Sequence, residues 1–276
     1  MLTKEIMGLF ALGVLWLNGA LVLAVAWKQL RAIGALRRMF AASKARGELV
    51  EGEIAEADAG VFARRHVAQT GRAVTTRGPS RILFTDGPQS FEVHGGALDT
   101  GDGRVTVDAA PIAASEVWTD DARSREAAGC SSDGEFDAAW TDASRFKGHT
   151  REVEVEVRRG DRVWVHGKRR DDALGPWDDR PLLVSMVDPI AWCAGRARLL
   201  VLFLVGGALS LALVTAIALV PPPFGTLSTV GGGLCLAWFL AIQPLGTAVR
   251  DAVRTPARQP VGVEWQRSRA VPSRAT

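Results

Sequence analysis

Three long stretches without a charged residue constrain this chain more than any other feature of its sequence. A helix needs roughly 20 consecutive apolar residues to cross the hydrocarbon of a bilayer, and the stretches 6–27 and 199–220 meet that length. The stretch 221–249 is weaker because Gln243 and Pro244 lie in its last turns, although proline is tolerated near the end of a span. We therefore expect three transmembrane helices, over about residues 6–27, 197–220 and 229–249.

The first apolar stretch has an alternative interpretation as a cleaved signal peptide. Ala24-Val25-Ala26 fits a small-x-small cleavage site. However, the stretch is longer than the apolar core of a typical signal, and the residues that follow it are basic without any acid, which hinders export. We expect an uncleaved membrane anchor.

The distribution of lysine and arginine predicts the orientation of the helices. Basic residues follow the first stretch, precede the second and follow the third, whereas the segment between the second and third carries no charge. The positive-inside rule then places the N-terminus outside and places residues 28–198 and the C-terminal tail in the cytoplasm. We expect a multi-pass protein of the cell membrane.

The basic residues beside the first span are also candidates for contact with lipid headgroups. The net charge of +3 comes largely from segments that flank the spans, which favours anionic lipid over nucleic acid as a partner. The plainer interpretation is that these residues set the topology and have no lipid specificity. No groove-reading helix or aromatic-basic strand platform for nucleic acid is present in the sequence. The candidate headgroup residues are Lys28, Arg31, Arg37, Arg38, Lys44 and Arg46.

Cysteine and histidine are too few and too scattered to indicate a metal centre. The three cysteines Cys130, Cys193 and Cys235 do not make a disulfide scaffold, and a zinc ring needs four closely paired ligands. The four histidines show no metal-ligand spacing. We expect no metal and no cofactor.

The segment between the first two spans, residues 47–188, has the pattern of a water-soluble β module. Short strands alternate with glycine-rich and proline-containing turns, which favours a small OB-like barrel. A capping box of Ser132 and Glu135 predicts a short helix near 133–147, and the segment 119–133 is polar and expected to be a loop. The expected strands are Glu48–Ile54, Ala73–Thr76, Ile82–Thr85, Phe91–His94, Arg104–Val107, Ser115–Trp118 and Leu182–Val187.

The predicted fold is thus a membrane-anchored, mainly β chain with an OB-like barrel inserted between transmembrane helices. Its expected parts are residues 1–46 with the first span and a basic juxtamembrane helix, the β module, the two further spans within 189–249, and a basic disordered tail over 250–276.

The stretch Arg151–Arg170 predicts a hairpin of that module. Valines alternate with polar residues on both sides of a Gly-Asp turn, which sets Val157 opposite Val163 on a buried face. On the exposed face, Glu154 and His166 would then lie across from each other. A carboxylate beside a histidine can perform general acid-base catalysis, as a hydrolase would require. Such pairs on an exposed strand face are more often simple surface pairs, and we expect no enzyme activity.

Two further regions are candidates for contacts with proteins. In the loop "GPWDDRP", Trp177 is flanked by proline and by Asp178 and Asp179, and exposed tryptophan is frequent in binding hot spots. The alternative is that this tryptophan folds back over the β module. Within the spans, Asn18 needs a polar partner on another helix, and the pair Gly206 and Ser210 allows close helix packing, in the same chain or in a homo-oligomer.

The order of these elements resembles a known family. An N-terminal span is followed by the strand "ELVEGEI", a segment with Phe91 and "DGRVTVD", a helix, the hairpin "RE…GDRVWVHG" and a second span. This order is similar to the GIDE-type domain of membrane-anchored proteins, known from mitochondrial-membrane ubiquitin ligases and bacterial relatives. The matching residues are Gly52, Glu53, Phe91, Gly103, Val105, Val107, Asp108, Arg151, Glu152, Gly160, Asp161, Val163, Val165 and Gly167.

The resemblance implies a β module that faces the cytoplasm, here of a bacterial inner membrane, and that binds or scaffolds an unidentified protein. Ligase chemistry is not implied, because the family's ligases carry a C-terminal zinc ring and this chain has a third span and a cysteine-free tail instead. NfeD-like proteins, extracytoplasmic OB-barrel regulators of membrane protein quality control, are the alternative resemblance. In those proteins, however, the barrel follows the spans.

Overall fold

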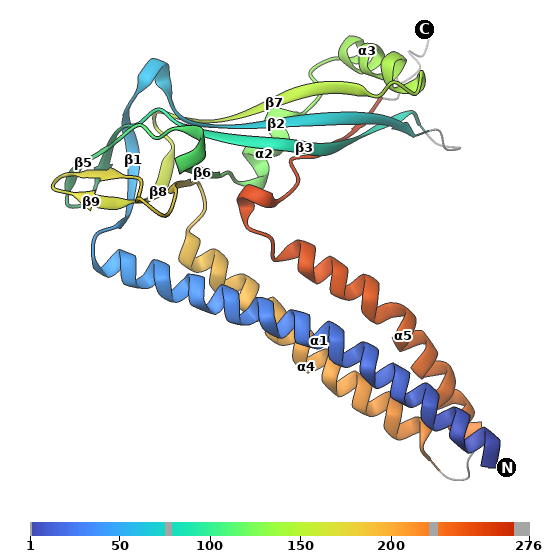
Figure 1. Ribbon diagram of the computed structural model, residues 1–276. Coiled ribbons are helices and arrows are strands. Elements are labelled where there is room, and N and C mark those ends of the chain that lie inside the picture. The colour runs from blue at the N-terminus through green and yellow to red at the C-terminus, as the bar shows by residue number, and fades with distance from the viewer. Residues whose placement is uncertain (1, 75–78, 221–225, 268–276) are drawn as a thin grey trace, which may run out of the picture. The chain divides into compact units, whose positions relative to one another are not determined.

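The computed structural model describes residues 2–74, 79–220 and 226–267, and it divides into two compact units. The helical unit comprises Met1–Ala41 and Pro189–Arg254, and the β unit comprises Ala42–Asp188 and Thr255–Thr276 (Figure 1). The β unit is therefore discontinuous in sequence, because its last segment follows the last helix of the helical unit.

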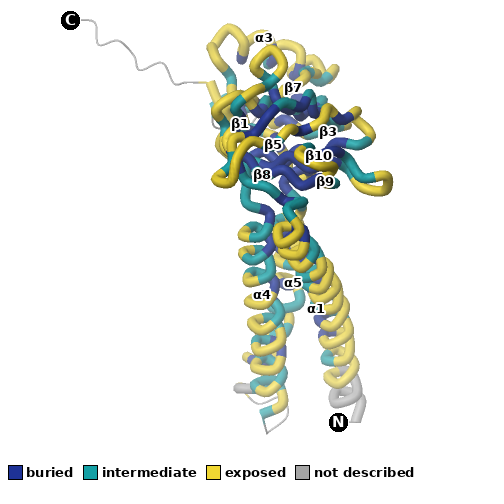
Figure 2. The backbone as a smooth tube through the Cα atoms, turned by 90° about the vertical axis from the view of Figure 1, so that its left-hand side faces the viewer, coloured by how far each residue is buried: buried dark blue, intermediate teal, exposed yellow. Residues whose placement is uncertain are grey.

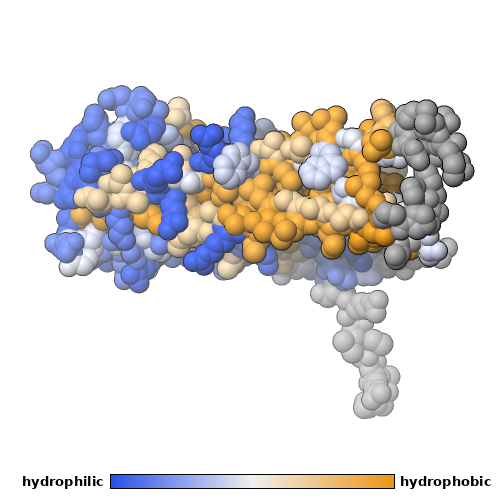
Figure 3. Space-filling model, turned by 90° about the horizontal axis from the view of Figure 1, so that it is seen from below, coloured by the Kyte–Doolittle hydropathy of each residue, from blue (hydrophilic) through white to orange (hydrophobic). Residues whose placement is uncertain are grey.

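Three helices are long and apolar enough to cross a membrane, as the sequence predicted. They are α1 (Leu2–Ala45), α4 (Pro189–Ala218) and α5 (Thr226–Ala252). Figure 2 shows exposed residues along all three helices, and Figure 3 shows a broad apolar surface on the face of the molecule seen from below. Lipid is the solvent that such surfaces require. The expected continuation of the first helix beyond residue 27 is confirmed, since α1 runs without interruption to Ala45.

Polar side chains of the helical unit meet across helix interfaces. Gln243 Nε2 on α5 donates to Asn18 Oδ1 on α1 at 2.9 Å, so the polar partner expected for Asn18 lies in the same chain. Ser210 on α4 accepts from Trp238 Nε1 at 2.9 Å. Among the described residues, no atom of another helix lies within 4 Å of the Cβ position of Gly206, and it is Gly207 that lies against Leu23 of α1.

In the described part of the β unit, twelve strands form two sheets. The first sheet has the order β6-β11-β8-β1-β4-β5-β10-β9 and curls into a half-barrel; the second has the order β12-β3-β2-β7. In chain order the strands are β1 (Leu49–Ala57), β2 (Val61–Val74), β3 (Arg81–Val93), β4 (Gly96–Thr100), β5 (Gly103–Val107), β6 (Ser115–Trp118), β7 (His149–Arg158), β8 (Arg162–His166), β9 (Lys168–Arg170), β10 (Ala173–Gly175), β11 (Leu182–Ser185) and β12 (Glu264–Gln266).

The structure does not confirm the predicted OB-like barrel of a mainly β chain. The first sheet is open, with β6 and β9 as its edges, and the chain is about half helical. The expected strands Glu48–Ile54, Arg104–Val107 and Ser115–Trp118 correspond to β1, β5 and β6. Those expected separately at Ile82–Thr85 and Phe91–His94 are parts of one long strand, β3. The end of the strand expected at Ala73–Thr76 lies outside the described residues.

The predicted hairpin of β7 and β8 is wrong. β7 pairs with β2 in the second sheet, whereas β8 pairs with β1 and β11 in the first. The chain changes sheets at Gly160, whose φ of 86° suits glycine, and Ile54 of β1 exchanges backbone hydrogen bonds with this turn. Val157 and Val163 nevertheless belong to one buried cluster. Their alternation thus defined the buried face correctly but not the partner strands.

Two helices accompany the second sheet. α3 (Asp133–Ser144) begins at the predicted cap, where Ser132 Oγ accepts from the backbone N–H of Glu135. The helix ends before residue 147, where the sequence had placed its end. α2 (Asp121–Ala128) lies in the segment expected to be a loop; its start is capped by Asp120, but its polar sequence has no apolar periodicity that would have predicted it.

The expected disordered tail is in part an ordered segment, which we name the C-terminal strap (residues 255–267). Its strand β12 pairs antiparallel with β3, and Trp265 is 3% exposed. The Trp265 indole donates to Ala128 O at 2.9 Å and meets Phe84 edge-on at 4.8 Å. Burial of one large aromatic side chain gives this short strand the apolar contact that its length alone lacks. Residues 268–276 of the expected tail lie outside the described residues.

Candidate functional site

The second sheet has one covered face and one open face. Residues of β2 alternate between the two, so that Arg65, Val67 and Gln69 are buried while Arg64 and His66 are partly exposed. The buried face packs against α2, α3 and the strap through two apolar clusters. A strand surface with one dry and one wet side is normal for an antiparallel sheet. The open face is unusual because it carries many ionisable side chains.

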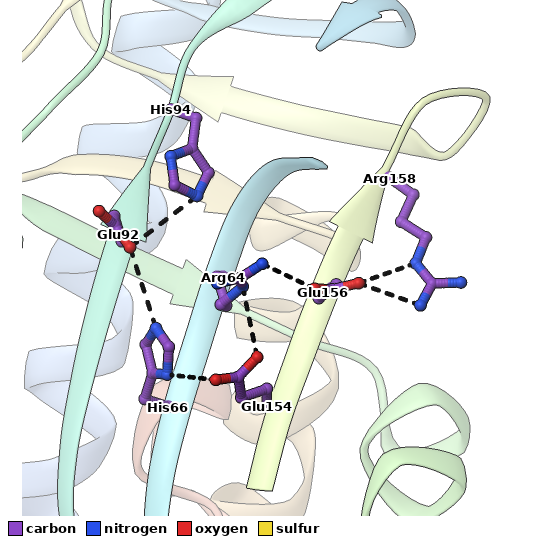
Figure 4. Close-up of polar contacts among 7 residues, drawn as sticks. All are labelled: Arg64, His66, Glu92, His94, Glu154, Glu156 and Arg158. Atoms are coloured by element: carbon purple, nitrogen blue, oxygen red, sulfur yellow. Dashed lines mark hydrogen bonds and ion pairs between the residues drawn. The ribbon is translucent and has the colours of Figure 1, made fainter. Parts of the chain in front are cut away.

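Seven ionisable side chains form a connected network on that open face, which we name the charged face (Figure 4). β2, β3 and β7 each contribute members, and His94 follows directly after β3. Its cross-strand register pairs His66 with Glu154 and Arg64 with Glu156. The members are Arg64, His66, Glu92, His94, Glu154, Glu156 and Arg158.

The network is held by short contacts at its centre. Arg64 Nη2 donates to Glu156 Oε1 at 2.9 Å, and Arg158 Nε donates to Glu156 Oε2 at 3.0 Å. The His66 ring lies between two carboxylates, with Nδ1 at 3.4 Å from Glu154 and Nε2 at 3.9 Å from Glu92. Partial burial alone would raise the pKa of Glu156, but the hydrogen bonds from both arginines hold its pKa below the ordinary value.

Three carboxylates and two guanidiniums meet in this network, so negative and positive groups are almost equal in number. The charged face therefore presents a surface of nearly balanced, mixed charge.

The charged face is poorly suited to catalysis because it is part of an open sheet surface. His66 and Glu154 make a carboxylate-histidine pair, but neither of the two cavities described in this chain is lined by them. Water reaches the partly exposed side chains of this sheet face, which weakens acid-base catalysis. Within the described residues, no cluster of histidine, cysteine, aspartate and glutamate has the arrangement to hold a metal ion.

The pair predicted from the sequence, Glu154 with His166, does not form. Because β7 and β8 belong to different sheets, Glu154 meets His66 instead. His166 is 4% exposed, with Nε2 at 3.0 Å from Ser43 Oγ, and burial, reinforced by the charge of Arg180, lowers its pKa to about 4. This histidine is a neutral structural group at neutral pH.

The loop that was expected to offer Trp177 to a partner is folded back. The Trp177 ring packs on the His166 ring at a centroid distance of 4.4 Å, and the guanidinium of Arg180 lies 4.8 Å from its centroid. Asp178 and Asp179 are exposed and pair with neighbouring cations. The two carboxylates remain accessible, whereas the indole is half-buried.

The six candidate headgroup residues are all exposed. Five of them lie on α1, and Arg46 follows it and forms an ion pair with Glu48 at 2.6 Å. Exposure along one helix fits either a role in topology or a contact with anionic lipid.

Sequence reasoning missed the most buried charged residue. Arg65 is 1% exposed and donates five hydrogen bonds, three of them to carbonyl oxygens of the strap. The strap oxygens belong to Pro256, Ala257 and Gln259, at 3.1, 3.2 and 2.8 Å. On the same side, Asp86 accepts from the backbone N–H of Val261 at 2.7 Å. These bonds fasten the strap to the second sheet.

The fold and the charged face define a candidate multi-pass membrane protein with a discontinuous β unit whose second sheet has one open, charged side. Comparison with known proteins identifies no relative: no family model, no curated protein and no solved structure matches the chain.

Proposed function

We propose that this protein is a membrane-anchored scaffold that presents the charged face to a protein partner in the cytoplasm. The observation that carries the proposal is the asymmetry of the second sheet. One side is covered by α2, α3 and the strap, and the other carries a network of seven ionisable groups that are partly or fully exposed. Charge complementarity selects partners and orients encounters even where it adds little affinity. The resemblance to GIDE-type domains agrees with such a role and remains part of the proposal.

A binding role is favoured over catalysis by the construction of this face. Its groups are paired with one another on an open sheet, and no described cavity encloses them. Enzymes bury reacting groups to strengthen electrostatic interactions. The hydrolase hypothesis built on Glu154 and His166 has lost the contact on which it depended.

The scaffold proposal predicts position-dependent cross-linking in cells. A photo-reactive benzoylphenylalanine replaces Thr70, an exposed residue of β2 on the open side, or Arg125 on α2 as the matched control on the covered side. We expect an adduct of one defined mass from position 70 and none from position 125. Adding Glu92→Gln and Glu154→Gln should reduce that adduct about fivefold, because two charges near the contact are removed. Equal adducts from both positions, or insensitivity to the charge changes, would argue against the charged face.

The orientation is tested separately through Cys130, a half-buried cysteine of the β unit. In a Cys193→Ala, Cys235→Ala background, a membrane-impermeant maleimide should label Cys130 only after the cells are permeabilised. Labelling in intact cells would place the β unit outside, where the NfeD-like interpretation applies and where partners must then be sought.

A further inference from the structure

A lateral groove separates α1 from α5 within the helical unit. Its volume is about 310 Å³, at the lower limit of sites that bind small molecules. Leu21 and Val25 of α1 form one wall and are 61% and 53% exposed. Gly246 of α5 allows the helices to approach, since a Cβ atom there would lie 2.7 Å from Val22 Cγ1. The groove is thus open toward the lipid.

Polar side chains line this groove although both helices are otherwise apolar. Gln243, Thr247 and Arg250 follow one another at helical spacing on the exposed surface of α5, over about 10 Å of helix. Asn18 and Gln29 contribute from α1. The deep end holds the Gln243–Asn18 hydrogen bond, and the buried Nδ2 of Asn18 has no hydrogen-bond partner within the described part of the chain. A polar stripe in hydrocarbon is costly unless a polar group meets it.

The stripe begins at the level where lipid headgroups lie. Arg250 is the first charged residue after the apolar stretch of α5, and Lys28, beside Gln29, is the first after that of α1. Asn18 lies eleven residues from Gln29, about 16 Å along α1 and near the middle of the span. The polar zone of a bilayer is about 6 Å thick on each side, so Arg250, Gln29 and Thr247 lie within it or just below it. The polar part of a phospholipid, from its phosphate to its ester oxygens, matches that position.

We propose that the groove binds one anionic phospholipid of the adjoining leaflet. Its phosphate lies against Arg250 and Gln29, its ester oxygens meet Thr247, and an acyl chain follows Leu21 and Val25 past the deeper amide pair of Asn18 and Gln243. Arginine is suited to phosphate because its planar donors match two oxygens at once. This site differs from the exposed basic residues of α1, and it does not depend on the proposed function of the charged face.

A second copy of the chain is a less suitable occupant. Two copies in one membrane share their orientation, so a symmetric dimer has its axis along the membrane normal. The grooves of the two copies would then face each other at the same depth, and the two Arg250 side chains would approach each other. Like charges at such a contact oppose association.

Native mass spectrometry of the full chain in detergent micelles tests the site. The protein is titrated with palmitoyl-oleoyl-phosphatidylglycerol or with the corresponding phosphatidylcholine, and retained lipid adducts are counted. We expect one strongly retained phosphatidylglycerol and weaker retention of phosphatidylcholine. Arg250→Gln should reduce the retention of phosphatidylglycerol about fivefold, as expected for loss of one cation at the headgroup level.

Two further variants separate the groove from general surface charge. Arg254→Gln removes the same charge one turn further on, at a residue outside the groove lining, and should leave retention unchanged. Val25→Trp fills the groove without a change of charge and should lower retention of the lipid. Equal loss in Arg250→Gln and Arg254→Gln, or equal retention of both lipids, would overturn the proposal. The proposal would also be overturned if the protein forms a dimer that Val25→Trp dissociates, because a second copy of the chain would then occupy the groove.

Discussion

Replacing Arg65 by leucine is expected to release the C-terminal strap from the second sheet. The substitution removes five hydrogen bonds and leaves the carbonyl oxygens of Pro256, Ala257 and Gln259 without their donor. Removing one partner of a buried, charge-assisted network costs about 4 kcal/mol, which is nearly a thousandfold in the opening equilibrium. Hydrogen exchange of residues 256–266 should accelerate accordingly, and trypsin should cleave after Arg258.

Arg64→Leu is the matched control for this prediction. Arg64 is adjacent on the same strand but lies on the opposite face, where its ion pairs with Glu154 and Glu156 are partly exposed. Exposed pairs contribute less than about 1 kcal/mol, so the strap should stay protected. If exchange of the strap is unchanged in Arg65→Leu, the buried arginine does not fasten it. If both variants release the strap equally, the effect is a general weakening of the sheet.

The second large effect is expected on acidification, through His166. Burial lowers the pKa of His166 to about 4, whereas an unfolded histidine has a pKa of about 6.5. The folded state therefore prefers the neutral ring, and its contribution is complete above pH 6.5 and lost as the pH falls. The loss amounts to about 3 kcal/mol between about pH 7 and pH 4, after which both states are protonated and no more is lost.

Denaturant unfolding of the full chain, followed at several pH values, measures this loss. Carboxylates also titrate in acid, so the informative quantity is the difference between the protein and a His166→Gln variant, in which an amide retains the capacity to donate to Ser43. The variant should be less sensitive to pH by about 3 kcal/mol. His66→Gln, on the charged face, serves as the control for replacing a histidine elsewhere in the β unit. Identical pH profiles for all three would show that His166 does not govern acid stability.

The sequence predicted those elements whose signal is local. Charge-free length was sufficient for the three spans, since a bilayer sets the length of an apolar helix whatever surrounds it. The cap of α3 was found because Ser132 and Glu135 satisfy backbone groups only a few residues away. Both signals are independent of the remainder of the fold.

Partners distant in sequence were not predictable in the same way. Alternating valines in β7 and β8 defined a buried face, but a strand's face does not state which strand it pairs with, and the Gly-Asp turn separates two sheets rather than closing a hairpin. The strap was missed because β12 has three residues and no alternation to detect. The charged face was missed for the same reason, since His66 and Glu154 are brought together only by the pairing of β2 with β7.

One signal for the buried arginine was nevertheless present. Arg64 and Arg65 are neighbours in a segment with strand character, and successive side chains of a strand point to opposite faces. One of the two therefore had to face inward. Recognising this would have predicted a buried cation that needs acceptors, although not that the strap supplies them.

The discontinuity of the β unit imposes an order on how the protein is made. Strands β1 to β11 leave the ribosome before α4 and α5, whereas the strap is synthesised after both helices. Until residues 256–259 emerge on the same side of the membrane as Arg65, that guanidinium lacks three of its five acceptors. The second sheet can therefore be completed only after α5 has been inserted into the membrane in the correct direction. In a chain whose α5 is inserted in the opposite direction, β12 could not pair with β3. The edge of the second sheet would then stay unpaired and accessible to proteases.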